Sequence, residues 1–261
     1  MARAVLRPGN RMMRTFLLLT LAASILFIAW PGLDLEVSGW FYATPGGFWR
    51  ASDPFYSWMR DLIRWSGHLA LIAALCIGLA NLRLGARQKT GWRVWLFGVA
   101  SGVLGPGLLV NGILKPLVGR ARPADLVEFG GSRAFTPAYR IADQCVASCS
   151  FTSGEAALVA AVAVPILLVL WPSLGRSGRA WLLGLAALYI ATGSGLRVAM
   201  GRHFLSDVVL SVLFSTTIAL ILYRVMGIAA ARARFVTTDI GDDLRRILAA
   251  LWAGIAGLWR Q

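Results

Sequence analysis

Three short clusters of polar residues interrupt an otherwise apolar chain, and each contains side chains able to bind phosphate. They cover residues 115–123, 150–155 and 197–207. An arginine side chain presents a planar fork that matches phosphate oxygens, whereas a lysine acts as a point charge. The first and third clusters hold five such cations, which are Lys115, Arg120, Arg122, Arg197 and Arg202. If the fold brings the clusters together, these residues predict an anion-binding site.

A histidine in the third cluster supplies a group that could react with phosphate. His203 lies four residues before Asp207, so on a helix the Asp207 carboxylate could accept a hydrogen bond from the imidazole. An oriented imidazole among cations is suited to act as a nucleophile or base. In the second cluster Ser153 and Gly154 open a predicted helix, and the free N–H groups at a helix start attract anions.

Each of these features, taken alone, has a simpler structural explanation. A basic residue at the end of a membrane helix usually extends its charge to the interface, and a Ser-Gly pair often allows close helix packing. His68 has no comparable neighbours in the sequence, so we interpret it as a structural residue. The prediction of chemistry rests on the ordered combination of the three clusters.

The composition identifies the scaffold that must bring the clusters together. Apolar residues make up 57% of the 261 positions and charged residues only 15%, against about 25% charged in soluble proteins. The mean hydropathy of +0.67 leaves too few polar side chains to cover a surface in water. The same values exclude intrinsic disorder, and no repeat supports a collagen-like or coiled-coil chain. The chain is therefore predicted to be an integral membrane protein.

Six apolar segments are long enough to cross a hydrocarbon core about 30 Å thick. Because backbone polar groups in a bilayer need internal partners, each segment should be a helix. The expected fold is an all-α, polytopic bundle of six transmembrane helices, with a kink at Pro106. Trp30-Pro31-Gly32 follows the first segment in place of a small-residue cleavage site, so this segment is expected to be a retained helix. The six segments cover residues 15–33, 65–82, 94–114, 155–171, 180–195 and 204–223.

Basic residues are divided unequally between the two sets of loops, which predicts the orientation. Sixteen of the 26 Lys and Arg residues lie in the N-terminal region, the second and fourth connections and the tail. Because positive loops stay in the cytoplasm, both termini are predicted to be cytoplasmic and all three clusters to face the outer side. The net charge of +14 then reflects topology, and no basic stripe outside the loops supports nucleic-acid binding.

The residues after the sixth segment form a separate region. Apolar side chains recur at helical spacing from Ile240 to Trp259, with Arg245, Arg246 and Arg260 beside them. Such an amphipathic helix fits the inner membrane surface, and packing beneath the bundle is an equal alternative. We therefore divide the chain into a membrane domain, residues 1–224, and a cytoplasmic tail, residues 225–261.

The order and spacing of the clusters resemble the type 2 phosphatidic acid phosphatase superfamily. That superfamily includes bacterial membrane lipid phosphatases and vanadium haloperoxidases, and the six membrane segments favour the former. The resemblance implies a bacterial inner membrane protein whose active site faces the periplasm. The motif match spans residues 115–207, and the helix layout extends it to about residues 15–223. The matching residues are, in order, Lys115, Arg122-Pro123, Ser153-Gly154, Arg197, His203 and Asp207.

The resemblance implies a role for each matching residue. His203, oriented by Asp207, would attack phosphorus and give a phosphohistidine that water then hydrolyses. No metal and no other cofactor is implied. The partners implied are a phospholipid, isoprenoid or glycolipid phosphate as substrate and the surrounding membrane lipids. The phosphate oxygens would be held by Lys115, Arg122, Arg197 and the Ser153-Gly154 backbone, with Arg120 and Arg202 as candidate additional contacts.

One departure from the family pattern affects catalysis. The second motif of the family usually carries a histidine after Ser-Gly, which protonates the leaving oxygen, and here that position holds Glu155. Glu155 could act as the acid only when protonated. Nearby cations favour its charged form and burial favours its protonated form, so both readings stay open. Leu196 also replaces the serine that usually precedes the third-motif arginine.

Two cysteines precede the second cluster on the predicted outer side, where oxidising conditions permit a disulfide. Cys145 and Cys149 are four residues apart, and a regular helix gives this spacing a workable but imperfect distance. Both the bridged and the free form stay open. Cys76, within the second segment, is expected to be a small buried residue.

The favoured function is metal-independent hydrolysis of a lipid phosphate or diphosphate at the outer leaflet. Two alternatives keep the fold: a phosphotransferase that passes the phosphoryl group to another lipid, and a non-catalytic lipid-binding or transport protein. Candidate substrates are undecaprenyl diphosphate, phosphatidylglycerol phosphate, phosphatidic acid and lipid A. If Glu155 is a weak acid, better leaving groups such as diphosphates or anomeric sugar oxygens should react faster than phosphatidic acid.

Overall fold

The computed structural model of the chain describes residues 10–84, 91–146 and 149–232, together with positions 242, 245, 246, 249 and 252. Within these residues six helices are long and apolar enough to cross a membrane, which confirms the predicted all-α, six-span fold. They cover Arg11–Ala29, Pro54–Arg83, Trp92–Asp125, Gly154–Ser173, Arg176–Ala199 and Leu205–Val225.

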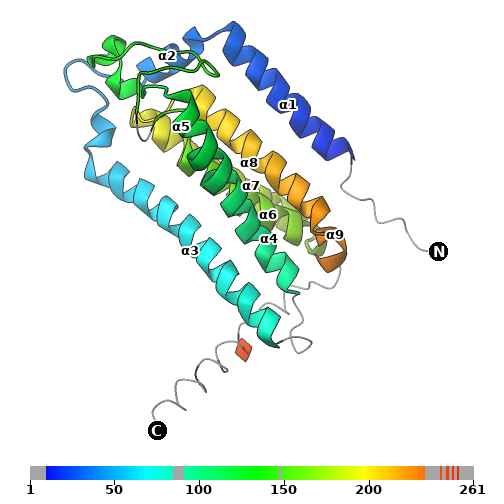
Figure 1. The fold of residues 1–261 in the computed structure, drawn as a ribbon. Helices are drawn as coiled ribbons and strands as arrows, with labels where there is room; N and C mark the ends of the chain where they lie inside the picture. Colours follow the sequence, from blue (N-terminus) through cyan, green and yellow to red (C-terminus); the bar gives the residue numbers. More distant parts are fainter. Residues whose placement is uncertain are drawn as a thin grey trace.

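The spanning helices pack side by side as a bundle (Figure 1). Helix α1 packs against α8 on one side of it, and α3 packs against α4 on the other. Helices α6 and α7 lie between these pairs. The bounds of the long helices are α1 (Asn10–Ala29), α3 (Pro54–Leu84), α4 (Trp92–Gly102), α6 (Gly154–Leu170), α7 (Arg176–Ala199) and α8 (Leu205–Val225).

Helix α6 forms the centre of the bundle because its side chains are small and apolar. After Glu155 its sequence contains no charged residue. In an 18-residue apolar stretch of α6, 56% of the positions are buried, against 11% in the corresponding stretches of α1 and of α3. Helices α3, α4, α7 and α8 all contact it. Small side chains let neighbouring helices approach closely, so the start of α6 has a well-defined position among its neighbours.

The outer faces of the peripheral helices carry large apolar side chains. Leu18 and Ile28 on α1, and Leu69 and Ile72 on α3, are each more than half exposed. An apolar surface this extensive would be unfavourable in water, whereas in a bilayer it contacts hydrocarbon. The pattern of exposure is therefore that of an integral membrane protein.

The third span departs from α-helical geometry around its proline. Helix α4 passes into a π-helical segment, η3 (Val103–Leu114), which contains Pro106, and then into the short helix α5 (Lys115–Val118). Proline lacks an N–H to donate and its ring crowds the preceding turn, so helices deform there. The deformation predicted at Pro106 extends over all 12 residues of η3. This segment carries Asn111 and leads directly into Lys115.

The second span is longer than the sequence predicted. Helix α3 begins at Pro54, whereas the prediction began at residue 65 because Arg60, Asp61 and Arg64 are charged. In the structure Asp61 pairs with both arginines, since its Oδ1 lies 3.1 Å from Arg60 Nη1 and from Arg64 Nη2. The additional turns bring Arg60 close to the polar clusters.

Short elements cover one end of the bundle, which we call the site end. Helix α1 begins at the opposite end of the bundle (Figure 1). Helix α8 also ends there, beside α9 (Ile228–Ala231). A further 3₁₀ turn, η6 (Trp171–Ser173), follows α6. The elements at the site end are α2 (Gly32–Gly39), η1 (Trp49–Ala51), η4 (Pro123–Asp125) and η5 (Val127–Phe129).

The predicted amphipathic helix of the tail lies outside the described residues, apart from the five separate positions named above. The division of the chain between residues 224 and 225 stays a prediction.

Candidate active site

Main-chain hydrogen bonds join the three polar clusters at the site end. Ser150 N donates to Arg120 O at 2.9 Å, which joins the second cluster to the first. Ala124 N donates to Gly201 O at 3.0 Å, which joins the residue after the first cluster to the third. Segments far apart in the sequence therefore meet through their backbones, as the sequence analysis required.

A polar cavity of about 380 Å³ lies among the clusters. Four cationic side chains line it, and one of them, Arg60, comes from α3. Such a concentration of positive charge at a small cavity favours an anionic ligand. The other polar or functional residues lining it are His68, Asn111, Gly154, Glu155 and His203, with Lys115, Arg122 and Arg197 completing the cations.

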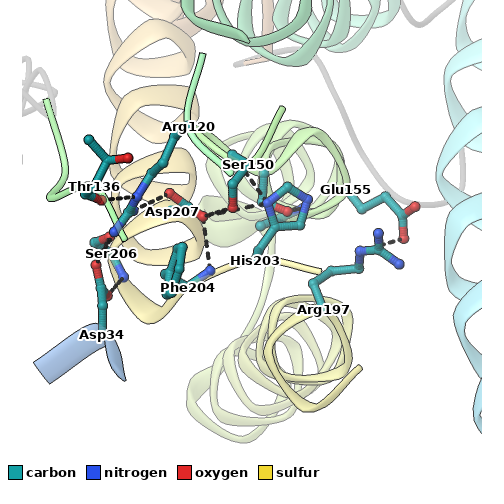
Figure 2. A network of polar contacts seen from close by, with 12 residues as sticks. Asp34, Arg120, Thr136, Ser150, Glu155, Arg197, His203, Phe204, Ser206 and Asp207 are labelled. Atoms are coloured by element: carbon teal, nitrogen blue, oxygen red, sulfur yellow. Dashed lines mark hydrogen bonds and ion pairs between the residues drawn. The ribbon is translucent and has the colours of Figure 1, made fainter. Parts of the chain in front are cut away.

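His203 lies in the turn between α7 and α8, with its side chain only 3% exposed. Its Nδ1 atom is 2.8 Å from Ser150 O (Figure 2). A backbone carbonyl can only accept, so Nδ1 carries the proton and Nε2 carries the lone pair. Burial, together with the charges of Arg197 and Lys115, lowers the pKa of the imidazole to about 4, and Asp207 opposes this shift. The ring is therefore neutral at neutral pH.

The acceptor for the imidazole differs from the one predicted. Asp207 Oδ2 lies 3.7 Å from His203 Nδ1, which is beyond hydrogen-bond distance. The carboxylate instead accepts from Ser150 Oγ at 2.5 Å and from Phe204 N at 2.9 Å. Asp207 thus orients the ring through the segment that carries Ser150. Its negative charge also lies close enough to stabilise an imidazolium.

Arg120 belongs to a buried network and does not line the cavity (Figure 2). Its side chain is 0% exposed and donates to Asp207 Oδ1 and Asp34 Oδ2, each at 2.8 Å. It also donates to Ser206 Oγ at 2.9 Å and to Thr136 O at 2.7 Å. The prediction that Arg120 adds a phosphate contact is therefore wrong. We call these five residues the Arg120 network.

Asp34 is the member of the Arg120 network that lies outside the three clusters. Its carboxylate accepts from Ser206 N at 2.8 Å and from Ser206 Oγ at 2.6 Å. Burial raises the pKa of Asp34, and Arg120 opposes that rise. The contact joins α2 to the start of α8, the helix that carries Asp207.

Glu155 belongs to a second, more open group of charges, the Glu155 group, which also contains Arg60 and Arg197. Arg60 Nε lies 3.0 and 3.1 Å from the two carboxylate oxygens, and Arg60 Nη2 lies 2.5 Å from Oε1. Arg197 Nε lies 3.6 Å from Oε2. A carboxylate that accepts from a guanidinium on both oxygens is ionised. Glu155 therefore lies at the site in a form without a proton to donate.

The start of α6 offers less backbone to a phosphate than predicted. Ser153 Oγ accepts from Ala156 N at 3.3 Å and so caps the helix, while Ser153 N donates to Asp207 O at 3.4 Å. Ser153 is buried away from the cavity, whereas Gly154 lines it. A Cβ atom on Gly154 would lie 2.9 Å from Asn111 Oδ1, which accounts for the glycine.

The remaining predicted residues lie near the site without lining it. Arg202 is half-buried in the turn before His203 and is not among the residues that line the cavity. Cys145 and Cys149 are joined as a disulfide, with their Cα atoms 5.5 Å apart, in the segment leading to the second cluster.

Cys76 is exposed on α3, which corrects the expectation that it is buried.

Three residues of the site end were not identified from the sequence, Asp34, Arg60 and Asn111, and a fourth, His68, was interpreted as structural although it lines the cavity. Polar residues inside apolar segments are costly and often functional, and this signal could have identified His68 and Asn111. Arg60 was placed in a connection, outside any span. Asp34 gave no signal, because its partner Arg120 is 86 residues away in the sequence.

Comparison with known proteins agrees with this geometry. A family model described as PAP2 superfamily matches residues 95–230, which include all three clusters. A Lipid A 4′-phosphatase of Francisella tularensis subsp. novicida is 30% identical over 78% of this chain and 90% of its own length. A Lipid A 4′-phosphatase of Rhizobium etli is 33% identical over 74% of this chain and 79% of its own length. Another, of Rhizobium leguminosarum, is 44% identical over 44% of this chain and 48% of its own length.

No solved structure matches the chain. The family match nevertheless covers half of it, and two relatives align over most of their own length. The chain therefore belongs to the PAP2 superfamily, among its bacterial membrane lipid phosphatases.

Proposed function

We propose that this protein hydrolyses a lipid phosphate through a phosphohistidine formed on His203. The observation that carries the proposal is the 2.8 Å hydrogen bond from His203 Nδ1 to Ser150 O. It leaves Nε2 with a lone pair at a cavity that Lys115, Arg122 and Arg197 also line. A fixed, neutral imidazole beside three cations is suited to in-line attack on phosphorus.

In the first step His203 Nε2 attacks phosphorus, the N–P bond forms, and the bond to the lipid oxygen breaks with its electron pair on oxygen. The cations neutralise charge on the other phosphate oxygens. The new imidazolium is stabilised by Ser150 O and by Asp207, 3.7 Å away. In the second step water attacks phosphorus, the electron pair of the N–P bond returns to Nε2, and inorganic phosphate leaves.

The proposed substrate class is a lipid A type 4′-phosphate. Support comes from the three relatives named Lipid A 4′-phosphatase. An apolar cavity of about 260 Å³ between α3, α4 and α6 adjoins the polar cavity, and Leu71 lines both. Hydrocarbon beside the reacting phosphate fits this arrangement. The 4′ carbon of a sugar is not anomeric, so its oxygen leaves as an ordinary alkoxide, which requires a proton.

The proposed orientation places both termini in the cytoplasm and the site at the outer leaflet, on the periplasmic side. It is supported by the position of the site end, which lies opposite the start of α1 and the end of α8 (Figure 1). The charge distribution of the loops supports the same orientation. A reporter fused after Gln261 should register as cytoplasmic, and a periplasmic signal would reverse the assignment.

The test of function is phosphate release by purified protein from a panel of lipids. We expect release from a lipid A bearing a 4′-phosphate, with lower rates on phosphatidic acid, and His203→Asn should abolish release while leaving the protein folded in detergent. Phosphate recovered on a second lipid would identify a phosphotransferase. Binding without turnover by the parent protein would identify a non-catalytic member. Either result would overturn the hydrolase proposal.

A further inference from the structure

The reaction proposed above needs an acid that the matched motifs do not supply. A sugar alkoxide is a poor leaving group unless its oxygen is protonated as the P–O bond breaks. Glu155 occupies the position of the family's usual acid, but both of its oxygens accept hydrogen bonds from Arg60. The proton must therefore come from another group at the cavity.

The described residues that line the cavity leave few choices. Arg60, Arg122 and Arg197 keep their protons because a guanidinium is a very weak acid. Lys115 is assigned above to the phosphate oxygens, and Asn111 carries no acidic proton. His203 is the nucleophile. The other titratable residue at the cavity is His68, on α3, and an imidazole is the side chain most often used for acid and base catalysis near neutral pH.

The contacts of His68 orient its ring in the same way as those of His203. His68 Nδ1 lies 2.8 Å from Arg64 O, an atom that can only accept, so Nδ1 is protonated and anchored. Among the described residues Nε2 has no hydrogen-bond partner. The side chain is exposed and lines the polar cavity. One ring nitrogen is thus fixed by the helix, and the other is free to contact a ligand.

We propose that His68 is the catalytic acid and base of the reaction, an inference that rests on the proposed function. In the first step the imidazolium of His68 gives its Nε2 proton to the lipid oxygen as the P–O bond breaks, and the lipid leaves as an alcohol. His68 is then neutral. In the second step Nε2 takes a proton from the attacking water as the N–P bond breaks. The imidazolium is restored and inorganic phosphate is released.

In this arrangement Glu155 is a positioning residue. Its carboxylate accepts from Arg60 at 3.0 Å and lies 3.6 Å from Arg197, so it fixes two cations of the phosphate site. Loss of Glu155 should weaken the binding of every phosphate, whereas loss of His68 should slow chemistry that depends on proton transfer. The two residues are therefore separable by experiment.

The test uses His68→Asn in the full-length protein. The asparagine amide can replace the Nδ1 hydrogen bond to Arg64 O but can neither give nor take the catalytic proton. We expect single turnover of a lipid A 4′-phosphate to slow by about 100-fold or more, while the inhibition constant of inorganic phosphate changes by less than about 5-fold. Leu69→Ala, a neighbouring change at a side chain that is 60% exposed, should retain the parent rate.

A second probe is 4-nitrophenyl phosphate, whose phenolate leaves without a proton. With His68→Asn the first turnover should show a burst of nitrophenol close to the parent rate, followed by slow steady state as phosphohistidine accumulates. The inference would be overturned if His68→Asn turned over the lipid within about 5-fold of the parent rate. It would also be overturned if this variant lost phosphate binding in proportion to turnover. If the parent protein itself releases no phosphate from any lipid, the proposed function fails instead.

Discussion

Two groups of arginines and carboxylates lie within one end of the bundle, and they differ chiefly in their access to water. In the Arg120 network the side chains of Arg120, Asp34 and Asp207 are at most 1% exposed. In the Glu155 group the side chains of Arg60 and Glu155 are 26% and 21% exposed and that of Arg197 is 9% exposed, and all three line the cavity. His203 lies between the two groups in Figure 2.

The difference in exposure gives the two groups different roles, one in the stability of the site and the other in ligand binding. Removal of one member of a buried ion pair leaves a charge that neither water nor protein compensates. Partly exposed ion pairs are screened by water and contribute little to stability, so their cations remain available to a ligand. The Arg120 network should therefore determine whether the site folds, and the Glu155 group should determine how well it binds phosphate.

The largest effect on stability is expected from Arg120→Met. It leaves Asp34 and Asp207 buried without their shared cation and should lower the free energy of unfolding by about 3–5 kcal/mol. Thermal unfolding in detergent measures the change. Arg140→Met, at an exposed position, is the control and should have little effect. Equal melting temperatures for the two variants would contradict the assignment of Arg120 to a supporting network.

A smaller loss is expected from Asp34→Asn. The amide oxygen can still accept from Arg120 and from Ser206 Oγ, but it is neutral, and the amide NH2 group then faces Ser206 N, which loses its acceptor. We expect a loss of about 1–2 kcal/mol in the same assay. A loss as large as that of Arg120→Met would show that α2 depends on Asp34 for more than this network.

The smallest loss of stability is expected from Arg60→Met, with a clear loss of activity. The ion pair with Glu155 is partly exposed, so the free energy of unfolding should change by less than about 1 kcal/mol. Turnover should fall about 10- to 100-fold because Glu155 and Arg197 are no longer held in place. Unchanged turnover, measured beside unchanged stability, would remove the Glu155 group from the site.

The protonation of His203, the residue between the two groups, can be followed directly, without a measurement of stability. Nitrogen-15 NMR of histidine-labelled protein should give two imidazoles, assigned with His203→Asn and His68→Asn. The His203 signal should report a proton on Nδ1 and titrate at a pKa of about 4. Because the unfolded chain protonates near 6.5, His203 should favour folding above that pH and cease to do so as the pH falls toward 4. Titration near 6.5 would contradict its burial.

The spans could be predicted from the sequence because hydropathy and length suffice for a membrane helix. The start of α3 could not, since the charges of Arg60 and Asp61 conceal a helix whose ion pairs form only after folding. The residues at the site could be predicted where motif spacing identifies them, as for His203 and Arg197. The opposite environments of Arg120 and Arg122 could not, because burial depends on Asp34, a residue distant in the sequence.

The hydrogen bonds between the backbones of the three clusters have a consequence for how such a protein could change over time. Ser150 N to Arg120 O and Ala124 N to Gly201 O are contacts that any side chain at those positions can make, apart from proline at the donor. The geometry of the reacting groups is thus set independently of the side chains that face the lipid. Substitutions at the exposed apolar positions of α1 and α3, such as Leu18 and Ile72, could adapt the protein to a membrane of different thickness, or to a lipid with different chains, while the catalytic apparatus is inherited intact.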